Sequence, residues 1–468
     1  MSKTSTRTAS RLSPNDPGGG DIAWLLHILT SPDPALIGTA VAIAAGTTLC
    51  GRSPAGQPDA HLIRIADTAM SRTHASWVVG RGARELALSD MDSRNGTWLD
   101  GRPIRRRTLV RHGSVVRIGG TVGVVESGAS KWHAFDRPLR GMPGSSLEAR
   151  RMRSEMAAAA ETSLPTLIAG SAGTGKERAS AEIHTLSRRS GRLVRADVSA
   201  IGPEALESEL FGHVRNAFAS AFEAKAGRLR DADLGTLVLD DVAEMPLSVQ
   251  SKVLHWLETG RFVTMGGDAE VIVKVKVVAC TSANLDGRIA AGKFLPELAA
   301  KLRTHTVALV PVARRIADLM ALADAAAAPP GGANWSTALA PITAETMALY
   351  SWPGNLSELA RLLQVLRTVT PPVPMQALPR SLVEAARARA NATEHVQSMP
   401  QGDTTQPTPR AEELRKLLAR FNGDIDAAAR ALGRDRKHID AWLAIAGVTS
   451  GDTSPGLDVT RPSGGKIS

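Results

Sequence analysis

The hydrophobic pattern divides the chain into regions of different texture. Between residues 22 and 125, short apolar runs alternate with polar positions and are separated by Gly, Asp, Ser and Pro, which is typical of an all-β domain. Residues 147–325 instead alternate helical and strand-like segments, which predicts an α/β domain with a mainly parallel sheet. The clearest strands of the first region are expected at residues 62–65, 75–79, 85–88, 114–118 and 121–125.

Polar stretches set the domain boundaries. Residues 1–20 and 448–468 are rich in Gly, Ser, Thr and Pro, so we expect disordered tails there. Two further polar segments are predicted to be linkers, at residues 128–146 and 391–410. The resulting plan has a β domain at 21–127, an α/β core at 147–325, a helical lid at 326–390 and an all-α unit at 411–447.

Composition narrows the class of protein. A chain of 468 residues has room for about three domains. The net charge of +10 favours an anionic partner, such as nucleic acid or a phosphorylated protein. Cys50 and Cys280 lie in apolar runs and are expected to be buried free thiols. No uninterrupted apolar run reaches about 18 residues, so we expect a cytoplasmic protein without a membrane span.

A glycine-rich turn follows the apolar run at 164–169 and precedes a helix-forming segment. Its spacing is G-x-x-x-x-G-K, from Gly170 to Lys176. Glycines let several backbone N–H groups point at one anion, and the helix start and Lys176 add positive charge. This pattern predicts a nucleotide-binding site made by Gly170, Gly173, Thr174, Gly175, Lys176 and Glu177.

Two carboxylates end a strand further along the chain. The apolar run at 234–239 leads into Asp240 and Asp241. Beside a phosphate loop, the first carboxylate can order a magnesium ion on the nucleotide and the second can polarise the attacking water. We therefore expect ATP with Mg²⁺ as the cofactor, Asp240 as the metal-associated residue and Asp241 as the candidate catalytic residue.

Three islands in the β region point to a phosphate pocket of another kind. They are Gly51-Arg52, Ser71-Arg72-Thr73-His74 and the turn at 92–97. Their order resembles the forkhead-associated (FHA) domain, a β-sandwich that binds phosphothreonine peptides. The resemblance implies that His74 braces the loop, and that the phosphopeptide contacts are Arg52, Ser71, Arg72 and Asn95. The alternative is a β-sandwich that serves only as a spacer.

Four motifs of the central region occur in a family-specific order: the phosphate loop, E-L-F-G-H at 209–213, L-D-D at 239–241 and W-P-G-N at 352–355. Together they resemble the AAA+ domain of bacterial enhancer-binding proteins, the ATPases that remodel sigma-54 RNA polymerase. The resemblance implies an ATP-dependent homo-oligomer that contacts sigma-54, and Glu177 is common in that family.

Several functional positions of that family are changed here. The sigma-contacting loop G-A-F-T-G-A reads N-A-F-A-S-A at 216–221, and a shorter Asp241 stands in place of Glu. The other changed positions are Asp197, Ser282, Leu295, Lys301 and Ser357, which replace a positioning Asn, a sensor Asn, two arginine fingers and a lid Arg. Because an arginine finger can contribute several powers of ten in rate, we expect ATP to be bound but hydrolysed poorly. The alternative is that Arg303 supplies the finger.

The C-terminal helical unit has the pattern of a DNA-binding module. Amphipathic residues 414–421 are followed by a break at Asn422-Gly423, a second helix at 425–432, a turn at Gly433 and a third helix at 436–446. The unit resembles the Fis-type helix-turn-helix of enhancer-binding proteins. The resemblance implies DNA contacts by Arg434, Arg436, Lys437 and His438. A plain helical packing module is the alternative.

These readings combine into a transcription regulator. The FHA domain would recognise a phosphothreonine-containing protein, such as a Ser/Thr kinase or its substrate. The altered AAA+ core would bind ATP and transmit the signal, and the helix-turn-helix would bind DNA. Two rivals stay open: an active ATP-hydrolysing sigma-54 activator, and a phosphothreonine-dependent scaffold whose ATPase and DNA-binding parts are vestigial.

Overall fold

The computed structural model describes most of the chain up to residue 397. The described residues are 22–54, 61–80, 84–129, 139, 141–199, 202–219, 221–330, 334–397 and 424–425. The chain divides into two units, residues 1–393 and 394–468. The tails and almost all of the predicted helix-turn-helix, including its four candidate DNA contacts, lie outside the described residues.

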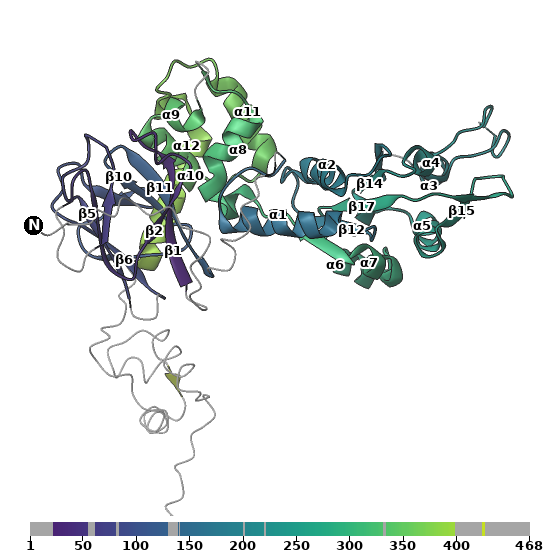
Figure 1. Cartoon of the computed structure of the whole chain (residues 1–468), viewed down its shortest axis with the longest axis horizontal. Helices are drawn as coiled ribbons and strands as arrows, with labels where there is room; N and C mark the ends of the chain where they lie inside the picture. Colours follow the sequence, from purple (N-terminus) through teal and green to yellow (C-terminus); the bar gives the residue numbers. More distant parts are fainter. Residues whose placement is uncertain are drawn as a thin grey trace, which may run out of the picture. The chain divides into compact units, whose positions relative to one another are not determined.

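The N-terminal region is a β-sandwich, as its alternating pattern predicts (Figure 1). Its two sheets share one apolar core that contains Trp77, Leu88 and Ile118. The first sheet has the order β2 (Ala40–Ile43), β1 (Ile22–Thr30), β11 (Thr121–Ala129), β10 (Val115–Ile118), β7 (Thr97–Leu99) and β8 (Arg102–Pro103). The second has the order β4 (His61–Arg64), β3 (Gly46–Gly51), β5 (Ala75–Val79), β6 (Leu86–Asp90) and β9 (Thr108–Val110).

The central region is a parallel sheet covered by helices. Its strand order is β13 (Leu193–Asp197), β14 (Thr236–Asp240), β17 (Lys276–Thr281), β12 (Thr166–Ala169) and β18 (His305–Ala308). All four neighbouring pairs are parallel, which confirms the expected α/β class. Because β17 alone separates β12 from β14, the segments that follow these two strands emerge at the same sheet edge.

Successive strand residues point to opposite faces, so each face has its own core. One face packs against α1 (Leu147–Ala160) and α2 (Lys176–Ser187). The other packs against α3 (Pro203–Phe211), α4 (Arg228–Asp231), α5 (Leu247–Thr259) and α7 (Pro296–Leu302). The remaining elements are η3 (Val242–Glu244), the hairpin β15 (Arg261–Val263) and β16 (Glu270–Ile272), and α6 (Leu285–Ala290).

Helices follow the last strand and form the lid. They begin at Val312, earlier than the predicted boundary at residue 326, because short 3₁₀ turns precede the first amphipathic helix. The last helix enters the predicted linker at 391–410, since no Gly or Pro interrupts it before Pro400. The elements are η4 (Val312–Arg314), η5 (Ile316–Asp318), α8 (Leu319–Ala326), α9 (Trp335–Ala338), α10 (Pro341–Leu349), α11 (Asn355–Leu366), η7 (Met375–Ala377) and α12 (Arg380–Gln397).

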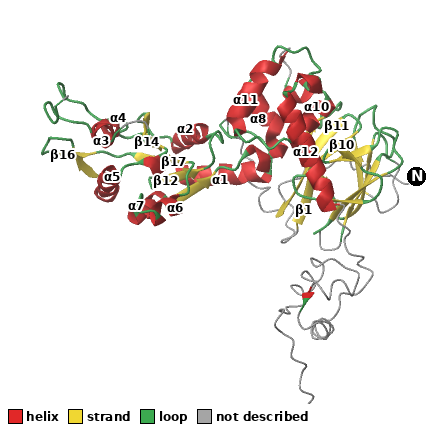
Figure 2. Ribbon diagram, turned by 180° about the vertical axis from the view of Figure 1, so that it is seen from behind, coloured by secondary structure: helices red, strands yellow, loops and turns green. Residues whose placement is uncertain are grey.

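The sandwich and the lid share a hydrophobic core, which the sequence analysis did not anticipate. Val115, Val122 and Val124 of β10 and β11 belong to one buried cluster with Trp335 and Met347 of the lid. The neighbouring residues of the same strands point into the sandwich, so both faces of β10 and β11 are buried. Figures 1 and 2 both show α10 beside these strands.

Polar contacts reinforce this shared core. The Nε of Arg117 in β10 lies 2.6 Å from the Oε2 of Glu345 in α10, and their side chains are 15% and 2% exposed. The Arg117 guanidinium also stacks 4.4 Å from the centre of the Trp98 ring. Thr30 Oγ1 at the end of β1 donates to the carbonyl of Ser336 in α9. The interface therefore combines apolar burial with specific polar pairing.

The start of α1 is tied to both neighbours. Ser146 caps the helix by accepting from Ala149 N at 3.0 Å, and its own N and Oγ donate to Asp318 of η5 at 2.8 and 2.5 Å. Glu126 of β11 accepts from Leu147 N at 3.0 Å and lies 2.9 Å from His27. Burial favours protonation of Glu126, but the bond and charge of His27 outweigh it, and its pKa is lowered.

Both cysteines are buried free thiols, as expected. Burial raises the pKa of Cys50 to about 12 and also raises the pKa of Cys280. Among the described residues, no helix combines the length and the apolar character that a bilayer crossing requires.

We predict that Glu345→Ala destabilises the sandwich–lid interface by about 3 kcal/mol, because it removes a buried carboxylate and leaves the partly buried guanidinium of Arg117 without its partner. Hydrogen exchange of the β10 and α10 backbone, together with the melting temperature, measures this effect. The control is Glu384→Ala in α12, whose partner Arg380 is 93% exposed, and it should cost no more than about 0.5 kcal/mol. Equal effects of the two substitutions would contradict the interface.

Candidate functional site

The structure brings the four predicted phosphopeptide residues to one cavity of the β-sandwich. Its volume is about 1020 Å³. The lining includes Arg94 and Ser53, which the sequence analysis did not assign to the site, although Arg94 lies inside the third island. Among the described residues, the lining is Arg52, Ser53, Thr68, Ala69, Met70, Ser71, Arg72, Thr73, Arg94 and Asn95.

Gly51 brings two of the pocket's loops into contact. A Cβ at this position would lie 2.2 Å from the carbonyl oxygen of Arg72, so no larger residue fits. The close approach lets Arg52 N donate to Ser71 O at 3.0 Å and Ser53 N donate to Arg72 O at 3.1 Å. The Gly-Arg pair therefore positions Arg52 beside the Ser71-Arg72 loop.

Side chains fasten the remaining loops of the pocket. Ser71 Oγ accepts from Arg94 N at 3.1 Å, and Asn95 Nδ2 donates to Ala69 O at 2.7 Å. His74 is fully buried; its Nδ1 accepts from Ser71 N at 3.0 Å and its Nε2 lies 3.1 Å from Gly96 O. This is the bracing role predicted for His74.

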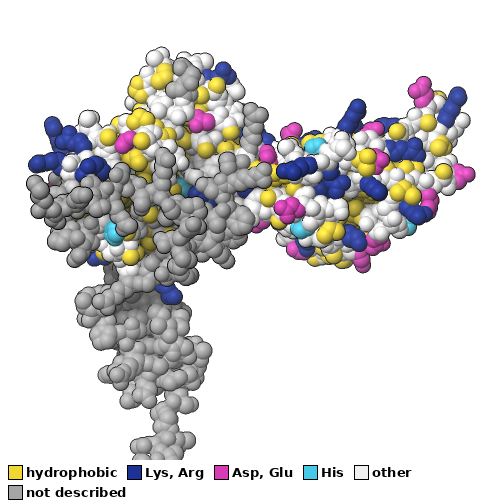
Figure 3. Space-filling view, in the orientation of Figure 1, with side chains coloured by type: hydrophobic (Ala, Val, Ile, Leu, Met, Phe, Trp, Pro, Cys, Tyr) yellow, Lys and Arg dark blue, Asp and Glu magenta, His cyan; other side chains and the backbone are white. Residues whose placement is uncertain are grey.

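Charge and donors in the pocket suit a phosphate. Arg52, Arg72 and Arg94 contribute three guanidinium groups to its lining, and each can present a planar pair of donors to phosphate oxygens. Figure 3 shows Lys and Arg side chains gathered on the visible face of the sandwich. Arg105 and Arg106, which do not line the cavity, are also exposed. The pocket can therefore hold a doubly charged anion between its loops.

The glycine-rich loop has the backbone of a phosphate cradle. Gly173 and Gly175 have φ of +75° and +100°, which side-chain-bearing residues rarely adopt. A Cβ at Gly170 would lie 2.8 Å from Thr174 Oγ1, and Thr174 is buried and donates to Ser171 O at 2.8 Å. These features fit the phosphates of a nucleotide.

The charged residues of the loop differ in their surroundings. Lys176 Nζ donates to Gly170 O at 2.9 Å, so its ammonium lies over the loop. The Glu177 side chain at the start of α2 is 82% exposed. Lys176 is thus placed to meet an anion in the cradle, whereas Glu177 extends into solvent.

The lid contacts this cradle directly. Asn355 Nδ2 donates to Ala172 O at 3.0 Å, its Oδ1 accepts from Val312 N at 3.0 Å, and Leu356 N donates to Gly173 O at 2.9 Å. Ser357 Oγ would lie 3.2 Å from a Cβ at Gly173. The W-P-G-N motif therefore joins α11 to the phosphate loop, and a short hydroxyl stands beside that loop at Ser357.

The carboxylates after β14 have partners within the protein. Asp240 Oδ2 lies 3.3 Å from Nη1 of Arg195, a residue that the sequence analysis did not assign to the site. Asp241 has φ of +51°, and Ser282 Oγ lies 3.5 Å from its Oδ1. Asp197 accepts from the N and Oγ of Ser199 at 2.9 and 2.7 Å, so it braces its own turn.

This donor set does not fit a magnesium ion held by the protein. Mg²⁺ needs oxygen ligands in near-octahedral geometry, and a phosphate loop usually offers it a hydroxyl and a free carboxylate. Here Glu177 takes the hydroxyl position with its side chain in solvent, and Asp240 already pairs with a guanidinium. The described geometry therefore does not support the predicted association of Asp240 with magnesium.

The residues predicted to stand at the arginine-finger positions make contacts within the protein. Leu295 packs against the apolar core beside α7, and Lys301 is half-buried near the end of that helix. Arg303 pairs with Asp286 at 2.7 Å, so the one arginine offered as a replacement finger has an intramolecular partner. In the loop at 216–221, Phe218 packs edge-on against His213 with ring centres 4.9 Å apart.

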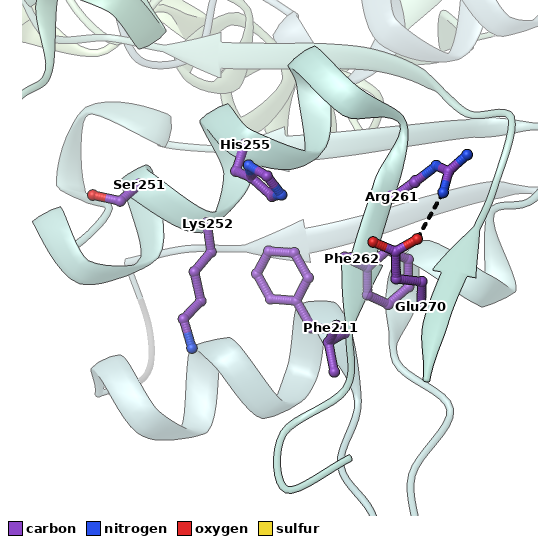
Figure 4. A pocket seen from close by; sticks show the side chains of 8 residues that line it. Phe211, Ser251, Lys252, His255, Arg261, Phe262 and Glu270 are labelled. Carbon is purple, nitrogen blue, oxygen red and sulfur yellow. Dashed lines mark hydrogen bonds and ion pairs between the residues drawn. The ribbon is translucent and has the colours of Figure 1, made fainter. Parts of the chain in front are cut away.

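A smaller cavity of about 330 Å³ lies between α3, α5 and the β15–β16 hairpin. Figure 4 shows Phe211 and Phe262 at its floor with Lys252, His255 and Arg261 around them. The two rings are 5.6 Å apart, and Arg261 pairs with Glu270 at 2.7 Å. None of these residues is a predicted site residue.

Gly173→Ala should detach the lid from the phosphate loop, because the new Cβ would lie 2.5 Å from the carbonyl oxygen of Gly354. Hydrogen exchange of residues 352–358 should increase. The control is Gly292→Ala, where φ is also positive but no atom lies within 4 Å of the new Cβ. Both variants carry about 1 kcal/mol of backbone strain, but only Gly173→Ala adds a clash with Gly354. Only Gly173→Ala should therefore loosen the lid. Unchanged exchange in Gly173→Ala would refute this contact.

Comparison with known proteins identifies two domains. Residues 48–119 match the FHA domain, and residues 142–308 match the sigma-54 interaction domain. The hydrogenase transcriptional regulatory protein HoxA of Cupriavidus necator is 32% identical over 317 residues, which cover 64% of this chain and 64% of HoxA. The DNA-binding transcriptional regulator NtrC of Escherichia coli K12 is 32% identical over 310 residues, 61% of this chain and 66% of NtrC.

The chain thus covers less than two thirds of the length of each of these relatives. Among solved structures, NtrX of Brucella abortus in complex with ATP is 28% identical, with a TM-score of 0.44 over 65% of this chain and 69% of that chain. The chain therefore contains an FHA domain followed by a sigma-54 interaction domain, and it is homologous to the transcriptional regulators NtrC and HoxA.

Proposed function

We propose that this protein is a phosphothreonine-responsive transcription regulator that binds ATP and turns it over poorly. The observation that carries the proposal is the FHA pocket, which unites Arg52, Ser71, Arg72 and Asn95 on a sandwich that shares its core with the lid. The lid in turn contacts the phosphate loop. Recognition of a phosphorylated partner and occupancy of the nucleotide site are thereby linked.

The pocket's chemistry favours a phosphopeptide. Phosphothreonine carries nearly two negative charges and three acceptor oxygens, which match guanidinium forks and short hydroxyl donors. Ser71 and Asn95 lie on two hydrogen-bonded loops that line the cavity and can contact the phosphate and the peptide backbone. The partner is then a phosphothreonine-containing protein, for example a Ser/Thr kinase or its substrate.

The phosphate loop would hold the nucleotide. Residues Gly170 to Lys176 supply backbone donors and one ammonium group to the ATP phosphates. ATP supplies the phosphoanhydride bond, whose cleavage requires stabilisation of charge in the transition state. The chain lacks the groups that usually provide it, since Leu295, Lys301 and Ser357 occupy those positions. We therefore propose that the protein binds ATP but hydrolyses it slowly or not at all.

A continuous set of contacts connects the two sites. Asp67 is buried and accepts from Ala69 N of the pocket loop at 2.9 Å and from Gly120 N at 2.7 Å. Thr121, next to Gly120, lies 3.0 Å from Ser31 Oγ, and the adjoining Thr30 binds the lid. We propose that ligand binding in the FHA pocket changes nucleotide affinity through this route and the shared core.

DNA binding by residues 411–447 stays a prediction from the sequence. Homology to the DNA-binding regulator NtrC supports it, and so does the net charge of +10. Sigma-54 polymerase as a partner is supported by the match to the sigma-54 interaction domain. The altered loop at 216–221 weighs against activation in the usual way, and assembly into a homo-oligomer is likewise proposed by analogy.

The active sigma-54 activator is the second candidate, and the domain match favours it. It requires a finger residue that reaches a neighbouring subunit. Arg303 would have to leave Asp286 to serve this purpose. A scaffold without nucleotide or DNA binding is the third candidate, and the intact geometry of the phosphate loop opposes it.

For the FHA site, we predict that the full chain selects phosphothreonine peptides from a library. Arg52→Ala should weaken the tightest one by about 10- to 100-fold, because one charge-assisted pair of hydrogen bonds is lost. Fluorescence anisotropy measures the affinities. Arg106→Ala, an equal change at an exposed position outside the cavity, should leave them unaltered. Absence of phosphothreonine selectivity, or equal binding by Arg52→Ala, refutes the assignment.

For the nucleotide site, we predict ATP binding by calorimetry and negligible phosphate release from the same preparation. Lys176→Ala should weaken binding by at least about tenfold, since an ammonium–phosphate contact is lost. Lys274→Ala, the same change at an exposed position of the α/β domain, serves as the matched control. Hydrolysis that rises with protein concentration, as expected of an assembling ring, would instead favour the active-ATPase candidate.

A further inference from the structure

We infer that Arg195 serves as the cation of the nucleotide site, so that the phosphate loop accepts a nucleoside polyphosphate without a divalent metal ion. The inference rests on the proposed nucleotide binding and concerns how that binding is achieved. Arg195 lies in β13, the strand that pairs with β14, and Asp240 ends β14. Arg195 therefore places a permanent positive charge beside Asp240, the carboxylate that is expected to associate with a metal ion.

The guanidinium of Arg195 bridges β14 and the helix that follows the phosphate loop. Its Nη1 lies 3.3 Å from Asp240 Oδ2, and its Nη2 donates to Glu177 O at 2.8 Å and to Ser180 Oγ at 2.9 Å. Glu177 and Ser180 belong to the first turns of α2, directly after Lys176. The guanidinium is therefore fixed beside the start of the phosphate-binding helix.

This geometry is specific to the planar fork of arginine. One nitrogen faces the carboxylate while another serves a carbonyl and a hydroxyl, which a point-like ammonium could not do from the same position. The Arg195 and Asp240 side chains are 29% and 31% exposed, so the pair is accessible from the site and only partly screened. The pair can meet a ligand without rearrangement of the sheet.

The same charges act together on a buried neighbour. Burial raises the pKa of the Cys280 thiol; the negative charge of Asp240 raises it further, while Arg195 and Lys176 oppose this. Cys280 lies in β17, between the strands that precede the carboxylates and the phosphate loop. Lys176, Arg195 and Asp240 therefore form one electrostatic cluster at this edge of the sheet.

The cluster explains how phosphates can bind beside a carboxylate. An unpaired Asp240 would repel a polyphosphate, and a divalent cation normally removes that repulsion. Arg195 neutralises Asp240 from within the chain, which leaves Lys176 and the backbone donors to attract the phosphates. A metal ion coordinates phosphate oxygens directly, whereas Arg195 is held by Asp240 and α2. This arrangement therefore suits retention of ATP rather than its hydrolysis.

The test compares ATP affinity in Mg²⁺ and in EDTA for the full chain, by calorimetry. Wild type should bind with affinities that differ by less than about threefold between the two conditions. Arg195→Ala should lose at least about tenfold affinity in EDTA and regain most of it with Mg²⁺, because Asp240 is then free to associate with the metal. Arg192→Ala, the same change at an exposed residue just before β13, should behave as wild type.

Asp240→Asn provides a second readout, in case Arg195→Ala does not fold. It should keep wild-type affinity in EDTA, because the carboxylate is not needed for a metal. A wild-type affinity that falls more than about tenfold in EDTA overturns the inference and leaves the nucleotide site intact. So does an Asp240→Asn variant that binds ATP more than about tenfold more weakly than wild type in Mg²⁺. Absence of ATP binding by wild type in both conditions would instead refute the proposed function.

Discussion

The burial of β10 and β11 against the helical lid is the contact on which the other features of this protein depend. These strands carry apolar side chains on both faces, so the sandwich cannot expose them to water without a large free-energy cost. The Arg117–Glu345 pair is specific to this arrangement, because its 2.6 Å contact requires β10 and α10 to pack in the observed register. The lid thus connects the FHA domain to the phosphate loop, with which Asn355 and Leu356 form hydrogen bonds.

This arrangement separates two properties that an ATPase normally combines. The cradle formed by Gly170 to Lys176 retains its positive-φ glycines and its ammonium, which serve binding. In the proposed function, Leu295, Lys301 and Ser357 replace the residues that would stabilise charge during hydrolysis, and Arg195, which lies 3.3 Å from Asp240, would neutralise its carboxylate. Under this proposal, a bound nucleotide would act as a ligand that stabilises the contact between lid and phosphate loop, and phosphopeptide binding in the FHA pocket would affect that contact through the shared core.

The sequence predicted the parts of the molecule better than their assembly. The strands, the phosphate loop and the FHA islands are encoded by local patterns, so the sequence is enough to assign residues such as Arg52 and Ser71 to one site. The sandwich–lid interface depends on contacts between residues some two hundred positions apart, such as Arg117 and Glu345, which no local period reveals. The doubly apolar pattern of β11 was the available signal. Arg195 was missed because it belongs to no motif, and only the strand order places it beside Asp240.

The most direct test of this account is the thermodynamic coupling between its two sites. ATP affinity should be measured by calorimetry with and without a saturating phosphothreonine peptide that binds the FHA pocket. We predict a change of at least about fivefold, with the same factor when the peptide is titrated into the ATP-bound protein. The change should vanish in Arg52→Ala. ATP affinity that is independent of a bound peptide in wild type would contradict the account, since the lid would then not connect the two sites.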